Sequence, residues 1–366
     1  MALVERCKAQ AASIATTDLS EAFNAIFQQW NLSASDEWNI SGEPCSGIAV
    51  DSSNISNPGI KCNCSSNGGS TCHITQIKLQ GLQLRGVIPE ELRSLTFLTD
   101  LDLSQNFITG PLPGFISRLT SIRSLSNNFS GLLPSELRLL LSLQQLDVSS
   151  NNFFGSVQLG NLPSPQKLNI SHNSYAAELP PELGNLFSLQ QLDISHNNYS
   201  GWLPPRLGSL SSLQQLVISY NYFADYLPPE LGKLASLQQL DISHNNFANW
   251  LPPELGNLSS LQQLDISFNN FIGSLPPQLG NLESLQQLNI SYNNFNNSFP
   301  LELGKLASLR LLDISYNNFV GSLPPDLIIF HKDFTSNLHQ EILETDKILI
   351  QLVFAAQSGP AHLLLY

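Results

Sequence analysis

Apolar and polar residues alternate in the same short pattern again and again through most of the 366-residue chain. In the stretch that begins at Leu237, the apolar residues Leu237, Leu240 and Ile242 are interleaved with Gln239 and Asp241. A period of two predicts a β-strand with one buried face. Outside two short copies the pattern recurs every 24 residues. The leading positions are Ile74, Leu98, Ile122, Leu143, Pro165, Leu189, Leu213, Leu237, Leu261, Leu285 and Leu309.

The pattern L-x-x-L-x-L-x-x-N fits a leucine-rich repeat, in which each repeat forms one coil of a solenoid. We therefore predict an α/β solenoid that forms a right-handed superhelix. Its parallel β-sheet would lie on the concave face, with short helical or 3₁₀ segments on the convex face. The predicted organisation is a leader-like segment (residues 1–17), a cysteine-containing cap (18–73), eleven repeats (74–332) and a non-repeat tail (333–366).

Each well-formed copy places an asparagine just after its strand, as at Asn245. A carboxamide both donates and accepts hydrogen bonds, so a buried ladder of asparagines would satisfy backbone groups where the chain turns. The following L-P-P-E-L-G-N-L segment carries proline at its start and glycine at its end, which suits a short helical or 3₁₀ piece.

A glycine before that segment, such as Gly201, is replaced in other copies. Asp225, Asn249 and Asn297 fit this place because Asp and Asn tolerate positive φ, whereas Ala177 does not fit. Two copies are irregular. The Ile122 copy lacks three strand residues and the Leu143 copy lacks the Pro-Pro pair, so we expect a local distortion between about residues 122 and 168.

The segment before the repeats reads as a cap for the open end of the solenoid. Apolar residues at helical spacing between Leu19 and Trp30 predict a short helix within residues 18–44. Residues 45–73 are polar and contain a cluster of four cysteines, Cys45, Cys62, Cys64 and Cys72, while Cys7 stands apart. The cluster suits either zinc or two disulfides, and three disulfide pairings are open.

Potential N-glycosylation sites favour the disulfides and the secretory route, because paired C-x2-C motifs are absent and N-x-S/T sequons are frequent. We expect an extracellular or cell-surface protein. A glycan on Asn169 or Asn289 would lie on the inner face. The sequons are Asn31, Asn39, Asn54, Asn63, Asn128, Asn169, Asn198, Asn257, Asn289 and Asn296.

The two ends of the chain are less regular. The first 17 residues lack the apolar core of a signal peptide, so we interpret them as an incomplete leader; a cytosolic protein is the alternative. The repeat pattern ends after Pro325. The apolar run 348–356 is too short to span a membrane and predicts an amphipathic helix over the last coil.

Composition narrows the function classes. The net charge of −13 argues against nucleic acid and anionic membranes as partners. An apolar content of 42% separates the chain from disordered acidic proteins. No cofactor is predicted.

The stretch AFNAIFQQWNLSASDEWNISGEPCSGIAVDSSNISNPGIKCNCSSNGGSTCHITQIKL resembles the N-terminal cap of plant leucine-rich-repeat receptor-like serine/threonine kinases that also carry a malectin-like domain. The NxFxGxLPPxLGxL half-repeat is similar to the plant class of these repeats. The resemblance implies an ectodomain followed by a malectin-like domain, one membrane span and a kinase. No VAIK, HRD or DFG element occurs here, so kinase activity does not carry over. The near-identity of the copies departs from the family and would fit tandem duplication, a truncated gene or a consensus construction.

Three surface columns are candidates for function. The first is acidic but interrupted, with Asp241 and Asp265 as its adjacent acidic pair in the regular region. Because the carboxylates are not continuous, a solvated face is favoured over a metal site. This column contains Asp147, Asn169, Asp193, Val217, Asp241, Asp265, Asn289 and Asp313.

The second column lies just past the strand and mixes histidines with aromatic residues. On an open face it suits recognition rather than acid–base catalysis, and no catalytic residue is predicted. This column contains His172, His196, Tyr220, His244, Phe268, Tyr292 and Tyr316.

The third column places Trp202, Tyr226 and Trp250 on successive coils where other copies have Ser or Glu. These aromatic residues either stack to stabilise the outer turns or contact a ligand. We expect this column to lie beside the second one. The predicted ligand-binding residues are Trp202, Tyr226, Trp250, Tyr220, His244, Phe268 and Tyr292.

These features together predict a non-enzymatic recognition module that binds a peptide, a protein or a cell-wall glycan, with a co-receptor as a further possible partner. One alternative is an ice-binding or structural solenoid. Another is a truncated receptor-kinase fragment or consensus repeat scaffold with no activity of its own.

Overall fold

The computed structural model describes residues 26, 28–30, 45, 59–66, 71–118, 127–139, 143–156, 162, 165–320 and 324. By its internal contacts the chain divides into two compact units, residues 1–174 and 175–366, and each is described by itself. The predicted leader, the tail and most of the cap helix lie outside the described residues, as do the sequons Asn31, Asn39 and Asn54.

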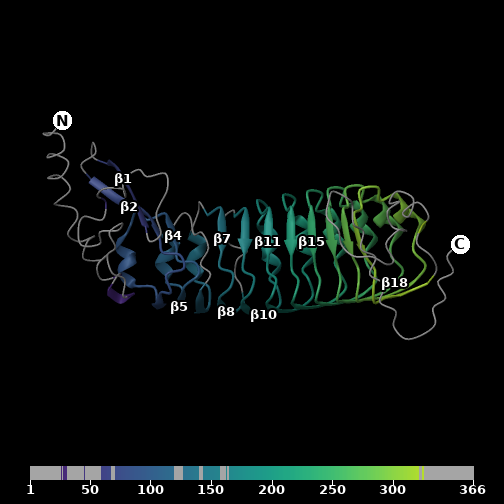
Figure 1. The fold of residues 1–366 in the computed structure, drawn as a ribbon, viewed down its shortest axis with the longest axis horizontal. Coiled ribbons are helices and arrows are strands. Elements are labelled where there is room, and N and C mark those ends of the chain that lie inside the picture. Colours follow the sequence, from purple (N-terminus) through teal and green to yellow (C-terminus); the bar gives the residue numbers. More distant parts are fainter. Residues whose placement is uncertain are drawn as a thin grey trace, which may run out of the picture. The chain divides into compact units, whose positions relative to one another are not determined.

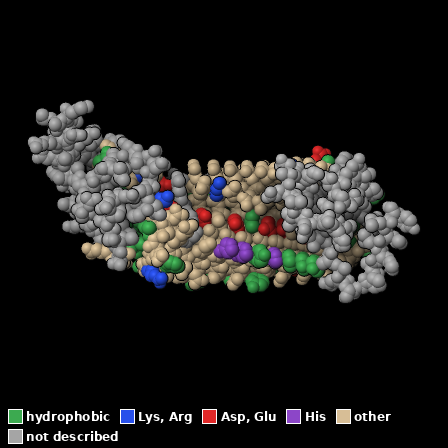
Figure 2. All heavy atoms as spheres, viewed as in Figure 1, with side chains coloured by type: hydrophobic (Ala, Val, Ile, Leu, Met, Phe, Trp, Pro, Cys, Tyr) green, Lys and Arg blue, Asp and Glu red, His purple; other side chains and the backbone are tan. Residues whose placement is uncertain are grey.

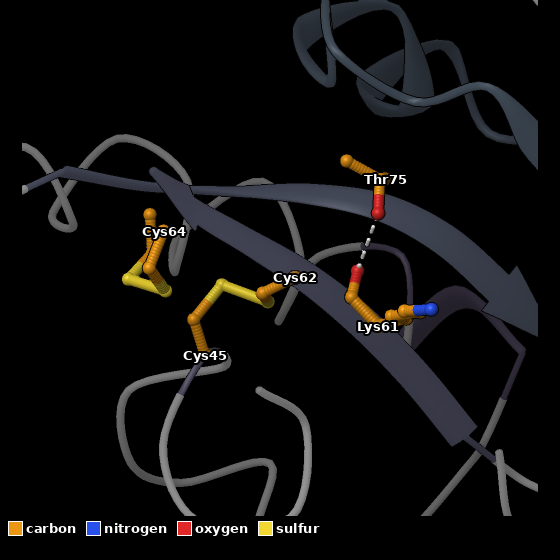
Figure 3. The surroundings of a disulfide bond; sticks show 6 residues. Cys45, Lys61, Cys62, Cys64 and Thr75 are labelled. Atoms are coloured by element: carbon orange, nitrogen blue, oxygen red, sulfur yellow. Dashed lines mark hydrogen bonds between the residues drawn. A yellow bond between two sulfur atoms is a disulfide. The ribbon is translucent and has the colours of Figure 1, made fainter. Parts of the chain in front are cut away.

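The first unit begins with a disulfide-bonded hairpin of β1 (Gly59–Ser66) and β2 (Thr71–Lys78), which pair antiparallel. The cysteines pair as Cys45–Cys62 and Cys64–Cys72, which selects one of the three possible connectivities (Figure 3). The Thr75 hydroxyl donates to the Lys61 carbonyl between the same two strands (3.3 Å; Figure 3).

The cap is fixed to the first coil. Trp30 is buried at the end of a short helical segment, and its indole N–H donates to the Val87 carbonyl (3.2 Å). β2 contains Ile74, the leading position of the first repeat, and pairs in parallel with the strand of the second repeat, β4 (Asp100–Asp102). The cap therefore continues the repeat sheet and does not leave its first strand unpaired.

In the rest of the first unit, strands of successive coils pair in parallel. The pairs are β7·β9, β3·β5, β5·β6 and β6·β8. Residues 119–126, 140–142, 157–161 and 163–164 of the expected distortion lie outside the described residues. The elements are β3 (Arg85–Gly86), η3 (Glu90–Ser94), β5 (Phe107–Gly110), η4 (Gly114–Arg118), β6 (Asn128–Gly131), η5 (Ser135–Leu139), β7 (Gln145–Asp147), β8 (Asn152–Gly155) and β9 (Lys167–Asn169).

In the second unit, each coil contributes one short strand to each of two parallel sheets and then a 3₁₀ segment (Figure 1). The first sheet, here called the inner sheet, contains β11 (Gln191–Asp193), β13 (Gln215–Val217), β15 (Gln239–Asp241), β17 (Gln263–Asp265), β19 (Gln287–Asn289) and β21 (Leu311–Asp313). Its strands pair in a register offset of one repeat, such as Leu240 with Leu264.

The second sheet, here called the lateral sheet, follows the corner after each inner strand. It contains β10 (Ser174–Ala177), β12 (Asn198–Gly201), β14 (Tyr222–Asp225), β16 (Asn246–Asn249), β18 (Asn270–Gly273), β20 (Asn294–Asn297) and β22 (Asn318–Phe319). The 3₁₀ segments are η7 (Pro181–Asn185), η8 (Pro205–Ser209), η9 (Pro229–Lys233), η10 (Pro253–Asn257), η11 (Pro277–Asn281) and η12 (Leu301–Lys305). The predicted leucine-rich-repeat fold is confirmed, with 3₁₀ turns as the helical elements of its coils.

The asparagine ladder has the predicted role. The Asn245 Oδ1 accepts from the Phe223 backbone N–H of the preceding coil (3.1 Å). Its Nδ2 donates to the Ile218 carbonyl of that coil (3.0 Å) and to the Ile242 and Ser243 carbonyls of its own coil. One buried carboxamide therefore satisfies the corner of its own coil and ties it to the preceding one.

A second buried row consists of aromatic rings that lie one per coil beneath the lateral sheet. Tyr199, Phe223 and Phe247 are fully buried, with successive ring centroids 6.0 and 6.1 Å apart. The Tyr199 hydroxyl is buried and has no hydrogen-bond partner among the described residues, and burial raises the pKa of Tyr199. This hydroxyl is therefore an unsatisfied polar group in an apolar row.

The glycines at the ends of the 3₁₀ segments are needed for a reason the sequence did not indicate. A Cβ atom on Gly256 would lie 2.3 Å from the Gln278 carbonyl oxygen of the next coil, and Gly208, Gly232 and Gly280 are in the same situation. Helix-ending conformation was the predicted reason, but close backbone approach between coils is the observed one.

The glycine position before the L-P-P segment does require positive φ. Asp225, Asn249 and Asn297 adopt φ of 66°, 66° and 67°, as their residue types predict. Ala177 has a φ of 91°. An alanine there carries backbone strain that glycine would not.

Ala177→Gly should therefore stabilise the second unit by about 1 kcal/mol, because relief of strain exceeds the added entropy of the unfolded chain. The midpoint of urea unfolding at unchanged m-value measures this change. Ala176→Gly is the matched control, since Ala176 lacks positive φ, and it should destabilise. Equal effects of the two substitutions would contradict the strain account.

Tyr199→Phe should raise the free energy of unfolding by about 1 kcal/mol, because it removes a buried hydroxyl without a partner and keeps the ring. The reverse change one coil on, Phe223→Tyr, should lower it. Thermal unfolding of both variants against the parent protein measures the pair, and a loss of stability in Tyr199→Phe would show that the hydroxyl has a partner.

Candidate functional site

The inner sheet of the second unit presents a row of residues, here called the acidic column, that also shapes the backbone. The Asp241 Oδ1 accepts from both the backbone N–H and the hydroxyl of Ser243 (3.0 and 2.7 Å). Asn289 makes the same two bonds to Ser291 (3.2 and 2.7 Å). A carboxylate is therefore not required for the turn. The column contains Asp193, Val217, Asp241, Asp265, Asn289 and Asp313.

Asp241 and Asp265 are register partners on adjacent strands. Burial raises the pKa of the Asp265 carboxyl, and the neighbouring Asp241 charge raises it further. The bonds from Ser267 and the Asn289 carboxamide, whose Nδ2 lies 3.0 Å from the Asp265 Oδ2, act in the opposite direction. In the described part of the chain, no three His, Cys, Asp or Glu side chains gather as metal ligands.

The second predicted column forms a continuous stack of rings within the second unit, here called the stacked ladder. Its centroid distances are 4.2, 4.0, 4.1, 4.0 and 3.9 Å, with neighbouring planes within 18° of each other. The ladder consists of His196, Tyr220, His244, Phe268, Tyr292 and Tyr316. His172, the remaining member of the predicted column, belongs to the first unit and is exposed.

Every ladder residue has a left-handed backbone, with φ between 51° and 54°. This conformation is unfavourable for a side chain with a Cβ, and ring stacking of about 0.5–1.5 kcal/mol per pair offsets the penalty. Each corner is also held by a backbone bond to the next coil, such as His244 N–H to the Ser267 carbonyl (3.0 Å). The ladder is therefore a structural feature as well as a surface.

Stacking determines which parts of the ladder rings are accessible to a ligand. The inner rings, Tyr220, His244, Phe268 and Tyr292, have a neighbour against each face, so they present edges and polar tips. Burial lowers the pKa of His244, although the Asp265 and Asp241 charges oppose that shift, and the net effect favours the neutral imidazole. Hydrogen bonding with Tyr316 raises the pKa of Tyr292, which keeps its hydroxyl protonated.

The third column, here called the aromatic patch, consists of Trp202, Tyr226 and Trp250. They are 51%, 45% and 72% exposed, and within the described coils their rings are not stacked on one another. Trp250 packs its indole against Gly273 of the next coil, where an added Cβ would lie 2.5 Å from the Trp250 Cδ1. Among the described residues these three rings therefore do not stack on one another, which was one of the two interpretations of this column, and each side chain is at least 45% exposed.

The lateral sheet separates the ladder from the patch and carries exposed apolar residues that the sequence analysis missed. Tyr222 and Ile272 are 58% and 41% exposed and point outward from β14 and β18. The signal was present in the sequence, because Tyr222 replaces the asparagine found at Asn198, Asn246 and the equivalent later positions. Figure 2 shows histidine and hydrophobic side chains in a band that runs alongside a row of acidic ones.

The sequons in the described residues fall into two groups. Asn63, Asn128, Asn198, Asn257 and Asn296 are exposed. Asn169 and Asn289 are half-buried on strands of the inner-sheet type, and their carboxamides accept hydrogen bonds from Ser171 and Ser291. A long apolar helix of the kind that crosses a bilayer does not occur among the described residues.

Comparisons with known proteins agree with this architecture. A family described as "Leucine-rich repeat region" matches residues 220–339, and one described as "Leucine Rich Repeat" matches residues 97–119 and 188–210. A probable LRR receptor-like serine/threonine-protein kinase of Arabidopsis thaliana is 47% identical over 87 residues, which is 22% of this chain and 8% of that protein.

Two solved structures are similar over most of the chain. The LRR ectodomain of the plant membrane receptor kinase GASSHO1/SCHENGEN3 from Arabidopsis thaliana, in complex with CASPARIAN STRIP INTEGRITY FACTOR 2, has a TM-score of 0.74 at 30% identity. That match covers 84% of this chain and 36% of the other. The PEPR1–AtPEP1 structure has a TM-score of 0.73 at 26% identity, over 92% of this chain and 48% of the other.

These matches show that the chain carries leucine-rich repeats and is similar in sequence and fold to the ectodomains of plant leucine-rich-repeat receptor-like kinases. The chain spans less than half the length of each of these proteins, and none of the matches reports on a malectin-like domain.

Asp241→Asn should increase stability at pH 7 by up to about 1 kcal/mol, because it removes a like charge roughly one strand spacing from Asp265. A raised folded-state pKa means that Asp265 favours the folded state below its ordinary pKa. That contribution is lost as the pH rises through the folded-state pKa. The advantage of the variant should therefore shrink as the pH falls toward 3.

The difference in melting temperature between variant and parent, measured from pH 7 to pH 3, tests this prediction. The substitution creates an Asn-Ile-Ser sequon, so both proteins should come from a bacterial host with disulfide-forming capacity. Asp193→Asn is the control, because its neighbour on β13 is Val217. A difference that does not vary with pH would contradict the repulsion account.

Proposed function

We propose that this leucine-rich-repeat solenoid, similar to plant receptor-kinase ectodomains, is a non-enzymatic recognition module that binds a secreted peptide or protein. The proposed site lies on the coils of the second unit whose leading residues are Leu189 to Leu285. It comprises Trp202, Tyr226, Trp250, Tyr220, His244, Phe268 and Tyr292. The observation that carries the proposal is the aromatic patch, whose large rings lie exposed and unstacked on successive coils.

Exposed tryptophan and tyrosine rings are the side chains that contribute most to binding energy at protein interfaces. Three exposed aromatic rings in a column where other coils have Ser or Glu form an apolar patch, and exposed apolar patches mark interaction sites. Ile272 extends the apolar surface from the patch toward the ladder. Together these residues form a surface that presents the exposed rings of the aromatic patch on one side and the edges of the stacked-ladder rings on the other.

The chemistry beside the ladder favours a peptide over a neutral sugar chain as the main ligand. Asp193, Asp241 and Asp265 line the inner sheet next to the ladder and suit lysine, arginine or an N-terminal amine. Exposed glutamine side chains such as Gln214 and Gln238 can pair with peptide amides. The similar GASSHO1/SCHENGEN3 ectodomain is in complex with CASPARIAN STRIP INTEGRITY FACTOR 2, and the other similar structure is that of PEPR1–AtPEP1; both support this class.

Catalysis is not supported by the geometry. The Ser243 hydroxyl is buried and donates to Asp241, whereas a serine nucleophile would donate to a histidine base. The same arrangement repeats at Ser195 and Ser267. These hydroxyls therefore hold turns together.

An extracellular or cell-surface location is part of the proposal. The two disulfides, Cys45–Cys62 and Cys64–Cys72, are consistent with an oxidising compartment, and the receptor-kinase relatives support the same placement. A co-receptor as a second partner remains a prediction from the resemblance.

The combined variant Trp202→Ala, Tyr226→Ala and Trp250→Ala should weaken ligand binding by about 100-fold or more, because exposed anchor rings at an interface contribute several kcal/mol together. Ligands would first be found by screening the secreted protein against synthetic plant signalling peptides and a cell-wall oligosaccharide array. Calorimetric titration of each hit then compares the variant with its parent.

Phe187→Ala is the matched control, since Phe187 is an equally exposed aromatic residue that follows η7, away from the patch. Unchanged affinity in the triple variant would reject the site. Hits confined to oligosaccharides would replace the peptide class with a glycan. Inhibition of ice recrystallisation without any hit would favour the structural, ice-binding alternative, and no activity in any assay would favour a scaffold or receptor fragment.

A further inference from the structure

The lateral sheet carries an exposed sequon, Asn198-Tyr199-Ser200, on β12. Asn198 and Ser200 are exposed, while Tyr199 between them is fully buried. The Asn198 carboxamide therefore points to the solvent side of the sheet, the side that also carries the exposed apolar residues. A sugar attached there would extend over the lateral sheet.

The nearest large exposed ring across the strands is that of Tyr222. Ser200 and Tyr222 are register partners in the β12·β14 pair, so Tyr222 is diagonal to Asn198 on the same face. With strands roughly 4.8 Å apart and a rise of about 3.3 Å per residue, the two Cα atoms lie about 8 Å apart. Tyr222 is 58% exposed, and other coils of the second unit have asparagine in its place.

We propose that Asn198 carries an N-linked glycan whose first N-acetylglucosamine packs against the ring of Tyr222. The Asn198 Nδ2 loses one proton and forms a bond to the anomeric carbon of the sugar. A lipid-linked oligosaccharide diphosphate is the donor and its diphosphate the leaving group. The C–H face of the sugar then covers part of an aromatic ring that would otherwise meet water. This inference rests on the secretory route in the proposed function.

The packed sugar would define one border of the proposed binding surface. Trp202 follows β12 directly, four residues after Asn198 and at most about 13 Å along an extended chain. A ligand on the aromatic patch would therefore meet the glycan at this end, while Tyr226 and Trp250, on the next two coils, stay open. The ring of Tyr222 would therefore contact the glycan, and the aromatic patch would contact the ligand.

The test compares two glycans in one molecule. The protein, given a signal peptide, is secreted from insect cells and treated in its folded state with a peptide N-glycosidase. Glycopeptide mass spectrometry follows release at each sequon. Asn296 is the internal control, because it is exposed on the same sheet and its register partner is Asn318. We expect release at Asn198 to be several-fold slower than at Asn296.

Two variants at Tyr222 test whether slow release at Asn198 results from packing of the sugar on the ring or from poor access of the glycosidase to this part of the sheet. Tyr222→Asn installs the residue that the two neighbouring coils have at this position, Asn198 and Asn246, so the fold is kept. It should bring the Asn198 rate up to that of Asn296. Tyr222→Phe keeps the ring and should leave the slow rate unchanged. Equal rates in the parent protein, or an unchanged slow rate in Tyr222→Asn, would overturn the inference.

The outcomes also separate this inference from the proposed function. An empty Asn198 with an occupied Asn296 overturns only the glycan contact, because secretion and glycosylation have then taken place. Empty sequons throughout the secreted protein would also contradict the glycosylation predicted from the sequence at the other sequons. Ligand binding is not needed for any of these measurements, so failure to find a ligand leaves the result intact.

Discussion

The hydrogen bonds of one buried carboxamide per coil are the constraint on which the rest of the solenoid depends. At each corner the chain leaves the inner sheet, and its backbone groups lose their strand partners inside an apolar core. The asparagine ladder satisfies those groups and links them to the preceding coil, as Asn245 does with Phe223 and Ile218. The left-handed corner residue next to each asparagine is then fixed in direction, and the rings of the stacked ladder meet because their backbones are held this way.

The sequence predicted the fold well because the fold depends on periodic features. The strand alternation at Leu240 and Ile242, the ladder at Asn245 and the tolerance for positive φ at Asn249 all follow from local chemistry repeated at a constant step. The role of Gly256 did not follow, because it depends on how closely the next coil approaches, which is a property of packing. Disulfide pairing was undetermined for the same reason, and the hairpin of β1 and β2 supplies the missing information.

The candidate site was only partly predictable. The identity of the aromatic columns was readable, but a list of residues does not say whether rings face one another. The structure distinguishes a ladder whose ring faces are occupied from a patch whose faces are open, although both consist of the same residue types. Tyr222 was overlooked because it interrupts a column of asparagines that suggests no function, and its importance depends on the diagonal neighbour that strand register gives it.

Because the coils are nearly identical, they do not by themselves determine at which coil a ligand binds. A surface that repeats at each strand gives a bound chain several equivalent positions, one coil apart, and a ligand that reads only the repeated features would slide among them. A single binding position therefore has to come from residues that break the repeat. Val217, Trp202, Tyr226 and Trp250 are such exceptions, and they are concentrated in three consecutive coils. The residues that depart from the repeat thus determine the position of a ligand on an otherwise repetitive surface.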